Sequence, residues 1–132
     1  MRKKFLSIAK EEASKSSHQF MVGAVLVCGS SIISRGYNKP NKTHKIAYRN
    51  HSTPAFATIH AEIDALVNVS KKISKKCTLY VVRLRRSDKQ ITLAKPCDMC
   101  MSVIKNMEVK KVFYTIAENH YGVIDLRNEK EQ

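Results

Sequence analysis

The sequence of 132 residues lacks any long hydrophobic run. Its longest nearly unbroken apolar stretch, Met21 to Cys28, is far shorter than the roughly 20 residues that cross a bilayer. Charged residues at 10–12 interrupt the N-terminal segment before it reaches the apolar length of a signal peptide. We therefore expect a cytoplasmic protein without membrane contact, in which the four cysteines are reduced. Metal binding or burial is then favoured over disulfide formation.

Acidic residues are scarce, because 11 Asp and Glu stand against 24 Lys and Arg, which gives a formal net charge of +13. This balance favours attraction to phosphate, on nucleotides or on nucleic acid. The sequence also lacks tryptophan and any arginine-rich block with interleaved aromatic residues. Scattered lysines without a binding role explain the charge equally well, so charge alone does not decide the partner.

The length and the pattern of apolar residues predict one domain over residues 1–132. Helices are predicted over 2–17, 60–72 and 96–107, and strands over 20–28, 31–37, 77–84 and 109–115. A polar loop is expected over 38–58 and a charged excursion over 85–94. Beyond Ala117 an edge strand and a docked segment both remain open. Strands separated by helices predict an α/β fold, a mixed sheet with helices on its faces.

Two fragments carry the residue types of a metal site: His-Ala-Glu from His60 and Pro-Cys-x-x-Cys from Pro96. Cys97 and Cys100, three residues apart at a helix start, lie on one face and can bind one ion together. The partial positive charge at a helix N-terminus favours the thiolate form that zinc requires. With His60 as third ligand, a fourth position is left for water, as in catalytic zinc sites. We predict one Zn2+ per chain.

Glu62 lies two residues after His60, so the two side chains can flank one point at a helix N-terminus. We expect its carboxylate to act on the water rather than on the metal. Zinc lowers the pKa of the water, and the carboxylate carries the proton from the water to the leaving group. This combination removes an amine hydrolytically from an amidine-like carbon. His60, Cys97 and Cys100 are thus predicted metal ligands, and Glu62 is the predicted catalytic residue.

Over nearly its whole length the chain resembles the cytidine and deoxycytidylate deaminase superfamily. The likeness rests on five fragments: Val22-Gly23-Ala24-Val25-Leu26-Val27, Gly36-Tyr37-Asn38, His60-Ala61-Glu62-Ile63-Asp64-Ala65-Leu66, Thr78-Leu79-Tyr80-Val81 and Lys95-Pro96-Cys97-Asp98-Met99-Cys100. The resemblance implies a three-layer α/β/α fold with a central mixed sheet of four to five strands. It also implies a zinc-deaminase signature in which the glutamate is not a ligand.

The resemblance further implies that Asn38 hydrogen-bonds the substrate near its sugar or base, and that the Ala61 backbone N–H holds the base. A histidine in the first motif is similar to the deoxycytidylate and tRNA-adenosine branches. Relatives commonly form dimers or larger rings, so we expect a homo-oligomer. Two features depart from the family: the segment 82–95 is longer than usual, and no helix that would hold RNA is evident after Thr115.

Basic residues offer further candidates for substrate contacts. Lys45 and Arg49 in the polar loop suit a substrate phosphate, and a solvated loop charge is the alternative. Arg83, Arg85 and Arg86 end a predicted strand. A basic patch for a polynucleotide, a subunit contact and a charge-guarded strand edge are the three alternatives there.

The leading hypothesis is zinc-dependent deamination of a cytosine nucleotide or nucleoside, with dCMP to dUMP and release of ammonia as the preferred reaction. The second keeps the chemistry and changes the substrate to cytosine or adenosine in single-stranded RNA or DNA. The third, from a different class, is a catalytically idle zinc protein that uses the fold for binding or assembly. Retention of Glu62 argues against it, because a purely structural site does not need this residue.

Overall fold

A central mixed sheet organises residues 1–40 and 58–127, the part of the chain that the computed structural model describes. Its strands are β1 (Phe20–Cys28), β2 (Ser31–Tyr37), β5 (Thr78–Arg85), β6 (Ile91–Thr92), β7 (Lys111–Ala117) and β8 (His120–Asp125). The strand order is β2-β1-β5-β7-β8, and β6 pairs with β5. Neighbouring strands are antiparallel except β5 and β7, which run parallel.

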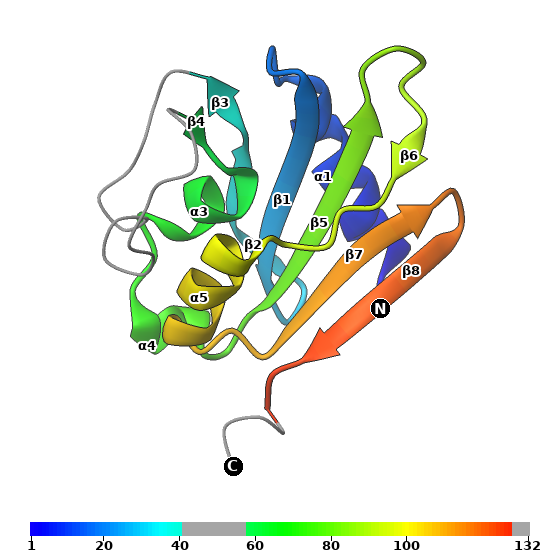
Figure 1. Cartoon of the computed structure of the whole chain (residues 1–132). Coiled ribbons are helices and arrows are strands. Elements are labelled where there is room, and N and C mark those ends of the chain that lie inside the picture. The colour runs from blue at the N-terminus through cyan, green and yellow to red at the C-terminus, as the bar shows by residue number, and fades with distance from the viewer. Residues whose placement is uncertain (41–57, 128–132) are drawn as a thin grey trace.

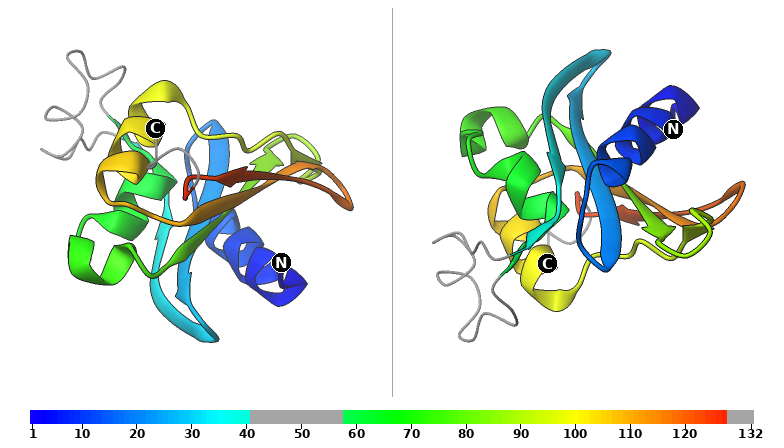
Figure 2. Two further views of the ribbon diagram at one scale, coloured as in Figure 1. Left: turned by 90° about the horizontal axis from the view of Figure 1, so that it is seen from below. Right: turned by 90° about the horizontal axis from the view of Figure 1, so that it is seen from above.

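Helices cover both faces of the sheet (Figure 1, Figure 2). One face carries α1 (Lys3–Ser14), and the other carries α3 (Ala61–Leu66), α4 (Lys71–Ser74) and α5 (Asp98–Asn106). The predicted three-layer α/β/α fold is confirmed, and short β6 makes the sheet six-stranded rather than four- to five-stranded. Within the described ranges, no helix has both the length and the apolar character that a membrane crossing needs.

The first core lies between α1 and the sheet. Phe5, Ala9 and Ala13 recur at helical spacing and are buried against β1 and β5. Gly23 of β1 allows the helix to approach, because a Cβ there would overlap the backbone oxygen of Ala9 and the backbone nitrogen of Ala13. The glycine of the Val-Gly-Ala fragment therefore has a packing role on this face.

The second core lies between the sheet and α3 and α5, on the opposite face. Leu26 of β1 and Val81 of β5 point into it, together with Ile63, Leu66 and Ile104 from the helices. Adjacent strand residues point to the α1 side, as the two-residue period of a strand requires. This face also carries the residues of the predicted metal site.

The predicted helix over 60–72 is wrong in its length, since α3 ends at Leu66 and α4 forms a separate turn. Asn68 and the β-branched valines around it are weaker helix formers than the preceding residues. Ser70 then adopts an extended conformation, φ −73° and ψ 152°, and its carbonyl accepts the N–H groups of Ile73 and Ser74. The extended conformation at Ser70 therefore separates α4 from α3.

Pairing between strands adds four short strands that the sequence pattern did not assign. In the charged excursion, β6 pairs with the end of β5, with Thr92 opposite Arg83. The polar C-terminal segment forms β8, which pairs antiparallel to β7 and confirms the edge-strand alternative. At the ends of the expected polar loop, β3 (Lys39–Pro40) and β4 (Thr58–Ile59) form a two-stranded ladder.

Candidate metal centre

His60 lies at the N-terminus of α3, where a short ladder and an ion pair hold the helix against the sheet. Ile59 pairs with Lys39, and His60 follows directly in an extended conformation, φ −76° and ψ 153°. One turn into the helix, Asp64 accepts the backbone N–H of Tyr37 at 3.2 Å and the ammonium of Lys39 at 2.5 Å. These contacts fix the position of His60 relative to β2 and β3.

The two cysteines lie at the start of α5. Cys97 immediately precedes the helix in an extended conformation, φ −71° and ψ 170°, and its carbonyl accepts the Met101 N–H at 2.8 Å. Cys100 lies in the first turn and is fully buried, whereas Cys97 is exposed. The Ala94 N–H donates to the Thr115 carbonyl at 2.8 Å, which ties the segment before α5 to β7.

Side chains of His60, Cys97 and Cys100 converge, as predicted. Nδ1 of His60 lies 3.7 Å from Cys97 Sγ and 3.3 Å from Cys100 Sγ, and the three ligand atoms lie within 4.8 Å of one another. Ligand atoms on one tetrahedral zinc ion are separated by roughly 3.5–3.8 Å, given bonds of about 2.0–2.3 Å. Zinc also favours imidazole nitrogen and thiolate sulfur. The cluster therefore fits a zinc ion. No other group of three such side chains in residues 1–40 and 58–127 has this geometry.

The two thiols have opposite electrostatic character. Hydrogen bonding from Cys100, and then from His60, lowers the pKa of Cys97 to about 4, so Cys97 is a thiolate at neutral pH. Hydrogen bonding to Cys97 and burial raise the pKa of Cys100 well above its usual value. The hydrogen bond to Cys97, and then the charge of Glu62, raise the pKa of His60. One ligand is thus already in the form that a metal requires, and the Cys100 proton would be released on binding.

Glu62 lies within the first turn of α3, beside this cluster. Its residue surface is 5% exposed, and burial raises the pKa of its carboxyl. The charges of His60 and Cys97 also act on that pKa, which requires them to be near. A buried carboxyl that can hold a proton next to a metal site is the arrangement that general acid–base catalysis needs.

Asn38 and Ala61, which are predicted to contact substrate, lie near the end of the sheet that carries the metal centre. Asn38 is 6% exposed; its Oδ1 accepts the Val22 backbone N–H at 2.9 Å, and its Nδ2 donates to the Phe20 carbonyl. Its amide therefore bonds to β1 in this structure, and its substrate role stays a prediction. Ala61 is buried as the first residue of α3, where N–H groups lack intrahelical acceptors.

Three further residues need separate mention: Lys45 and Arg49 lie outside the described part of the chain, and Asp64 was not predicted from the sequence. Lys45 and Arg49, predicted for a substrate phosphate, lie outside the described residues, so their role stays a prediction. Asp64 received no role from the sequence, although it positions α3. Its spacing of one helical turn after His60 was the available signal, because that places both on one side of the helix.

Known proteins with this fold include two solved deaminases. Cytidine deaminase from Burkholderia pseudomallei superposes with a TM-score of 0.68 at 18% identity, covering 97% of this chain and 94% of that one. The apo dCMP deaminase of cyanophage S-TIM5 gives a TM-score of 0.58 at 25% identity, covering 89% and 83%. A relative in sequence, the tRNA-specific adenosine deaminase of Rickettsia bellii, is 28% identical over 121 residues, which are 90% of this chain and 71% of the relative.

The family match covers every strand of the sheet except β8 and the last residue of β7, both helices that carry the site, and every ligand of the candidate centre. Residues 1–116 match the family described as cytidine and deoxycytidylate deaminase zinc-binding region. That match includes Glu62 and the cluster of His60, Cys97 and Cys100, whose convergence fits the zinc ion for which the family is described. The chain therefore belongs to the cytidine and deoxycytidylate deaminase family.

Proposed function

We propose that residues 1–132 form one catalytic domain that deaminates a cytosine nucleotide or nucleoside by hydrolysis, with dCMP as preferred substrate. His60, Cys97 and Cys100 would hold the zinc ion, and Glu62 would be the catalytic residue. The observation that carries the proposal is the burial of the Glu62 carboxyl beside a three-donor cluster. A structural zinc site would normally have a fourth protein ligand and no need of such a carboxyl.

Glu62 would transfer the protons of the reaction. Zinc, when bound, supplies the Lewis acidity that makes water nucleophilic at neutral pH. The Glu62 carboxylate accepts a proton from the water as the oxygen attacks the amino-bearing ring carbon. It delivers that proton to the ring nitrogen beside the attacked carbon. The second proton of the water then passes through Glu62 to the leaving amino nitrogen, so the C–N bond breaks, ammonia departs and a ring carbonyl remains. Burial favours the protonated carboxyl and thereby assists the step in which Glu62 accepts the proton from the water.

Substrate orientation would come from the start of α3 and from Asn38. The Ala61 N–H at the helix N-terminus is suited to an acceptor on the base edge. The second N–H of Asn38 Nδ2 and the second lone pair of its Oδ1, beyond the two bonds to the β1 backbone, would bond the sugar or base. Lys45 and Arg49 are proposed to bind a substrate phosphate. We also propose that several copies of the chain assemble, because relatives commonly form oligomers.

Ammonia release from the zinc-loaded protein tests the proposal, with cytidine, deoxycytidine and their monophosphates as substrates. We expect turnover of at least one, with dCMP the best. Absence of turnover on all four, with one zinc bound per chain, would contradict the proposal for small cytosine substrates.

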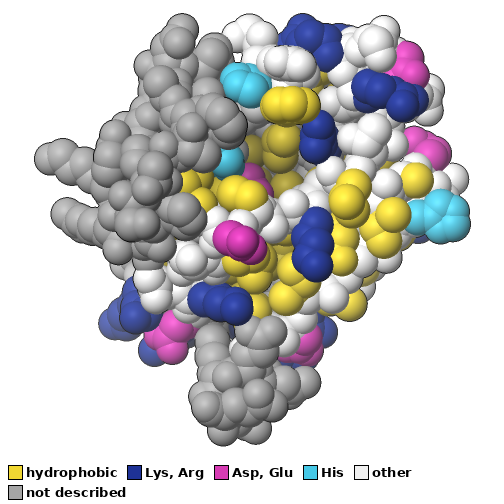
Figure 3. Space-filling view, viewed as in Figure 1, with side chains coloured by type: hydrophobic (Ala, Val, Ile, Leu, Met, Phe, Trp, Pro, Cys, Tyr) yellow, Lys and Arg dark blue, Asp and Glu magenta, His cyan; other side chains and the backbone are white. Residues whose placement is uncertain are grey.

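A second candidate function is deamination of a base within single-stranded RNA or DNA. The relative named a tRNA-specific adenosine deaminase favours it, as does the net charge of +13. Against it, Lys and Arg side chains are dispersed over the described part of the face in Figure 3 and form no continuous stripe there. Binding of a labelled oligonucleotide that weakens steeply with salt would support this function, and editing of the oligonucleotide would establish it.

A catalytically idle zinc protein is the remaining alternative. Glu62→Gln separates it from both enzymes, because an idle protein would keep every measurable function after this change. Loss of ammonia release with zinc retained would exclude the idle alternative.

A further inference from the structure

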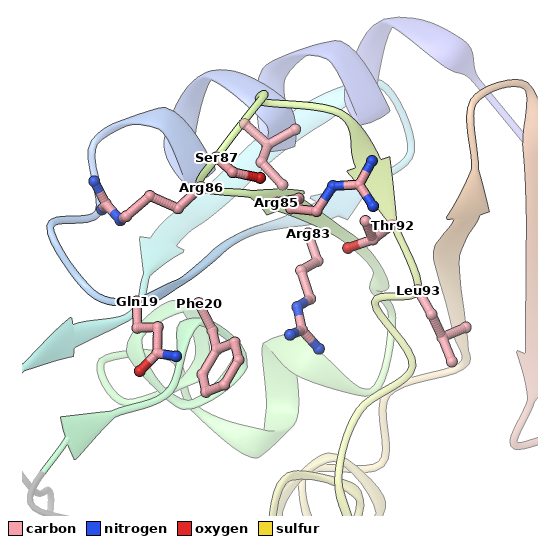
Figure 4. A pocket seen from close by; sticks show the side chains of 9 residues that line it. Gln19, Phe20, Arg83, Arg85, Arg86, Ser87, Thr92 and Leu93 are labelled. Atoms are coloured by element: carbon pink, nitrogen blue, oxygen red, sulfur yellow. The ribbon is translucent and has the colours of Figure 1, made fainter.

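A pocket lies between the start of β1 and the hairpin formed by β5 and β6 (Figure 4). Its volume of about 410 Å3 is within the range of roughly 300–1,000 Å3 that small-molecule sites occupy. Nine residues line it, three of them arginines and none acidic: Gln19, Phe20, Arg83, Leu84, Arg85, Arg86, Ser87, Thr92 and Leu93. Such a lining favours an anionic ligand.

Only one of the three arginines has a guanidinium that is free to bind a ligand. Arg85 makes two hydrogen bonds to the Asp88 carboxylate, at 2.9 and 2.8 Å. Arg86 donates to the backbone carbonyls of His18 and Ser16, at 2.9 and 2.7 Å. The side chain of Arg83 has no hydrogen-bond or ion-pair partner within residues 1–40 and 58–127.

Arg83 is nevertheless held in place. Its guanidinium carbon lies 4.6 Å from the ring centroid of Phe20, in cation–π contact. Phe20 is 47% exposed, which leaves the ring available as a platform on the pocket wall. This contact uses none of the guanidinium N–H groups in a hydrogen bond to an acceptor atom, and a guanidinium forms a bidentate fork with phosphate oxygens.

Strand register places Phe20 and Arg83 on the same face of the sheet as the metal centre. Ala24 and Leu26 of β1, and Val81 of β5, point into the core beneath α3 and α5. Alternation puts Phe20 and Arg83 on that same face. In Figure 4 both side chains point toward the side of the sheet where the green ribbon of α3 lies, whereas Arg85 and Arg86 extend away to either side.

Topology brings the pair to the same end of the sheet as the metal centre. The start of β1, the end of β2 and the end of β5 share that end, because Phe20 pairs with Arg85 and Gly23 pairs with Tyr37. From there, β3 follows β2 and its ladder with β4 leads into His60. Likewise, β6 pairs with the end of β5 and the chain continues from it to Cys97.

We infer that Arg83, stacked on Phe20, binds a phosphate group of the substrate whose base lies at the metal centre. The inference rests on the proposed deaminase function and assigns a specificity-determining role to a segment that is longer than is usual in the family. The phosphate can belong to a free mononucleotide or to a polynucleotide backbone, and both present the same oxygens to the guanidinium.

Product binding tests the inference without turnover. Zinc-loaded wild-type protein and the Arg83→Gln and Arg127→Gln variants are titrated with deoxyuridine, dUMP and a trinucleotide with central deoxyuridine. Inosine and IMP extend the comparison to the adenine alternative. Arg127→Gln removes the same charge from an exposed pair with Asp125, beyond the end of β8. Zinc content and unfolding midpoint confirm that each variant is folded.

We expect wild-type protein to bind dUMP or the trinucleotide about ten-fold more tightly than deoxyuridine. Arg83→Gln should remove that preference and leave deoxyuridine binding unchanged, and Arg127→Gln should preserve it. Loss confined to dUMP identifies a mononucleotide phosphate, and loss confined to the trinucleotide identifies a backbone phosphate. Equal losses in the two variants, or none in Arg83→Gln, would overturn the inference.

Ammonia release measured on the same wild-type preparation separates the two proposals. If nothing is deaminated while Arg83→Gln still weakens binding of phosphorylated ligands, the deaminase proposal fails and the phosphate site stands. If turnover is normal and phosphate brings no Arg83-dependent gain in binding, the phosphate site fails and the deaminase proposal stands.

Discussion

Gly36 of β2 lies directly against Ala61, the first residue of α3. A Cβ atom at position 36 would lie 2.5 Å from the Ala61 carbonyl oxygen and 2.6 Å from the Ala65 backbone nitrogen. The contact is with helix backbone, which cannot rotate away as a flexible side chain would. The absence of a side chain at Gly36 thus sets the distance between the sheet and the helix that begins beside His60.

Gly36→Ala should displace α3 and weaken both stability and zinc binding. Overpacking of this kind costs about 1–3 kcal/mol in the free energy of unfolding. Chemical denaturation of the metal-free protein and a zinc titration measure the two effects. Gly23→Ala is the matched control, because its clash is with α1 on the opposite face. It should lower stability and leave zinc affinity of the folded protein unchanged; equal zinc affinity in both variants would contradict this account.

Loss of any predicted ligand should remove the metal. His60→Ala, Cys97→Ser and Cys100→Ser are each expected to reduce zinc from one ion per chain to nearly none, because three protein donors are the minimum of a catalytic site. Metal analysis after dialysis measures this, with Cys28→Ser as a thiol control outside the cluster. Chelation of wild-type protein should abolish ammonia release, and added zinc should restore it. Full zinc content in Cys100→Ser would rule out the assigned ligand set.

Glu62→Gln should abolish proton transfer while preserving the site. The amide is nearly isosteric and cannot carry the proton, so kcat/KM for the best substrate should fall roughly 100- to 10,000-fold with zinc content unchanged. Glu12→Gln is a suitable control, since Glu12 is 3% exposed and lies on α1, on the other face of the sheet. Its turnover should match wild type. Comparable activity in the two variants would refute the role of Glu62.

The Cys77 thiol should make stability depend on alkaline pH. Burial, and then the nearby Cys28, raise the pKa of Cys77 from 9.0 to about 11. The unfolded chain therefore ionises first as pH rises, so this contribution to stability is complete below pH 9.0 and is lost as pH approaches 11. The stability difference between wild type and Cys77→Ala, from denaturation at several pH values, should be constant below pH 9.0 and shrink above it. A constant difference up to pH 11 would contradict the shift.

Local sequence was informative where one side-chain pattern decides the structure. The valine-rich run after Phe20 became β1, and the apolar spacing from Phe5 to Ala13 became α1. Both follow from alternation or helical periodicity, which any chain segment carries in itself. Periodicity did not predict the end of α3 at Leu66 or the strand β8. In both places backbone pairing and packing outweigh weak local propensities.

By itself, the sequence determined which residues make up the candidate site: a histidine, two cysteines and a glutamate at spacings that suit a catalytic zinc site, on predicted helix starts. Side-chain type and local spacing suffice for that, since ligands are chosen by their atoms. Only the tertiary structure decided that Asp64 and Gly36 set the position of α3, and that Arg83 stacks on Phe20 instead of guarding a bare strand edge. Those relationships join residues from different elements, and strand register and helix docking alone bring them into contact.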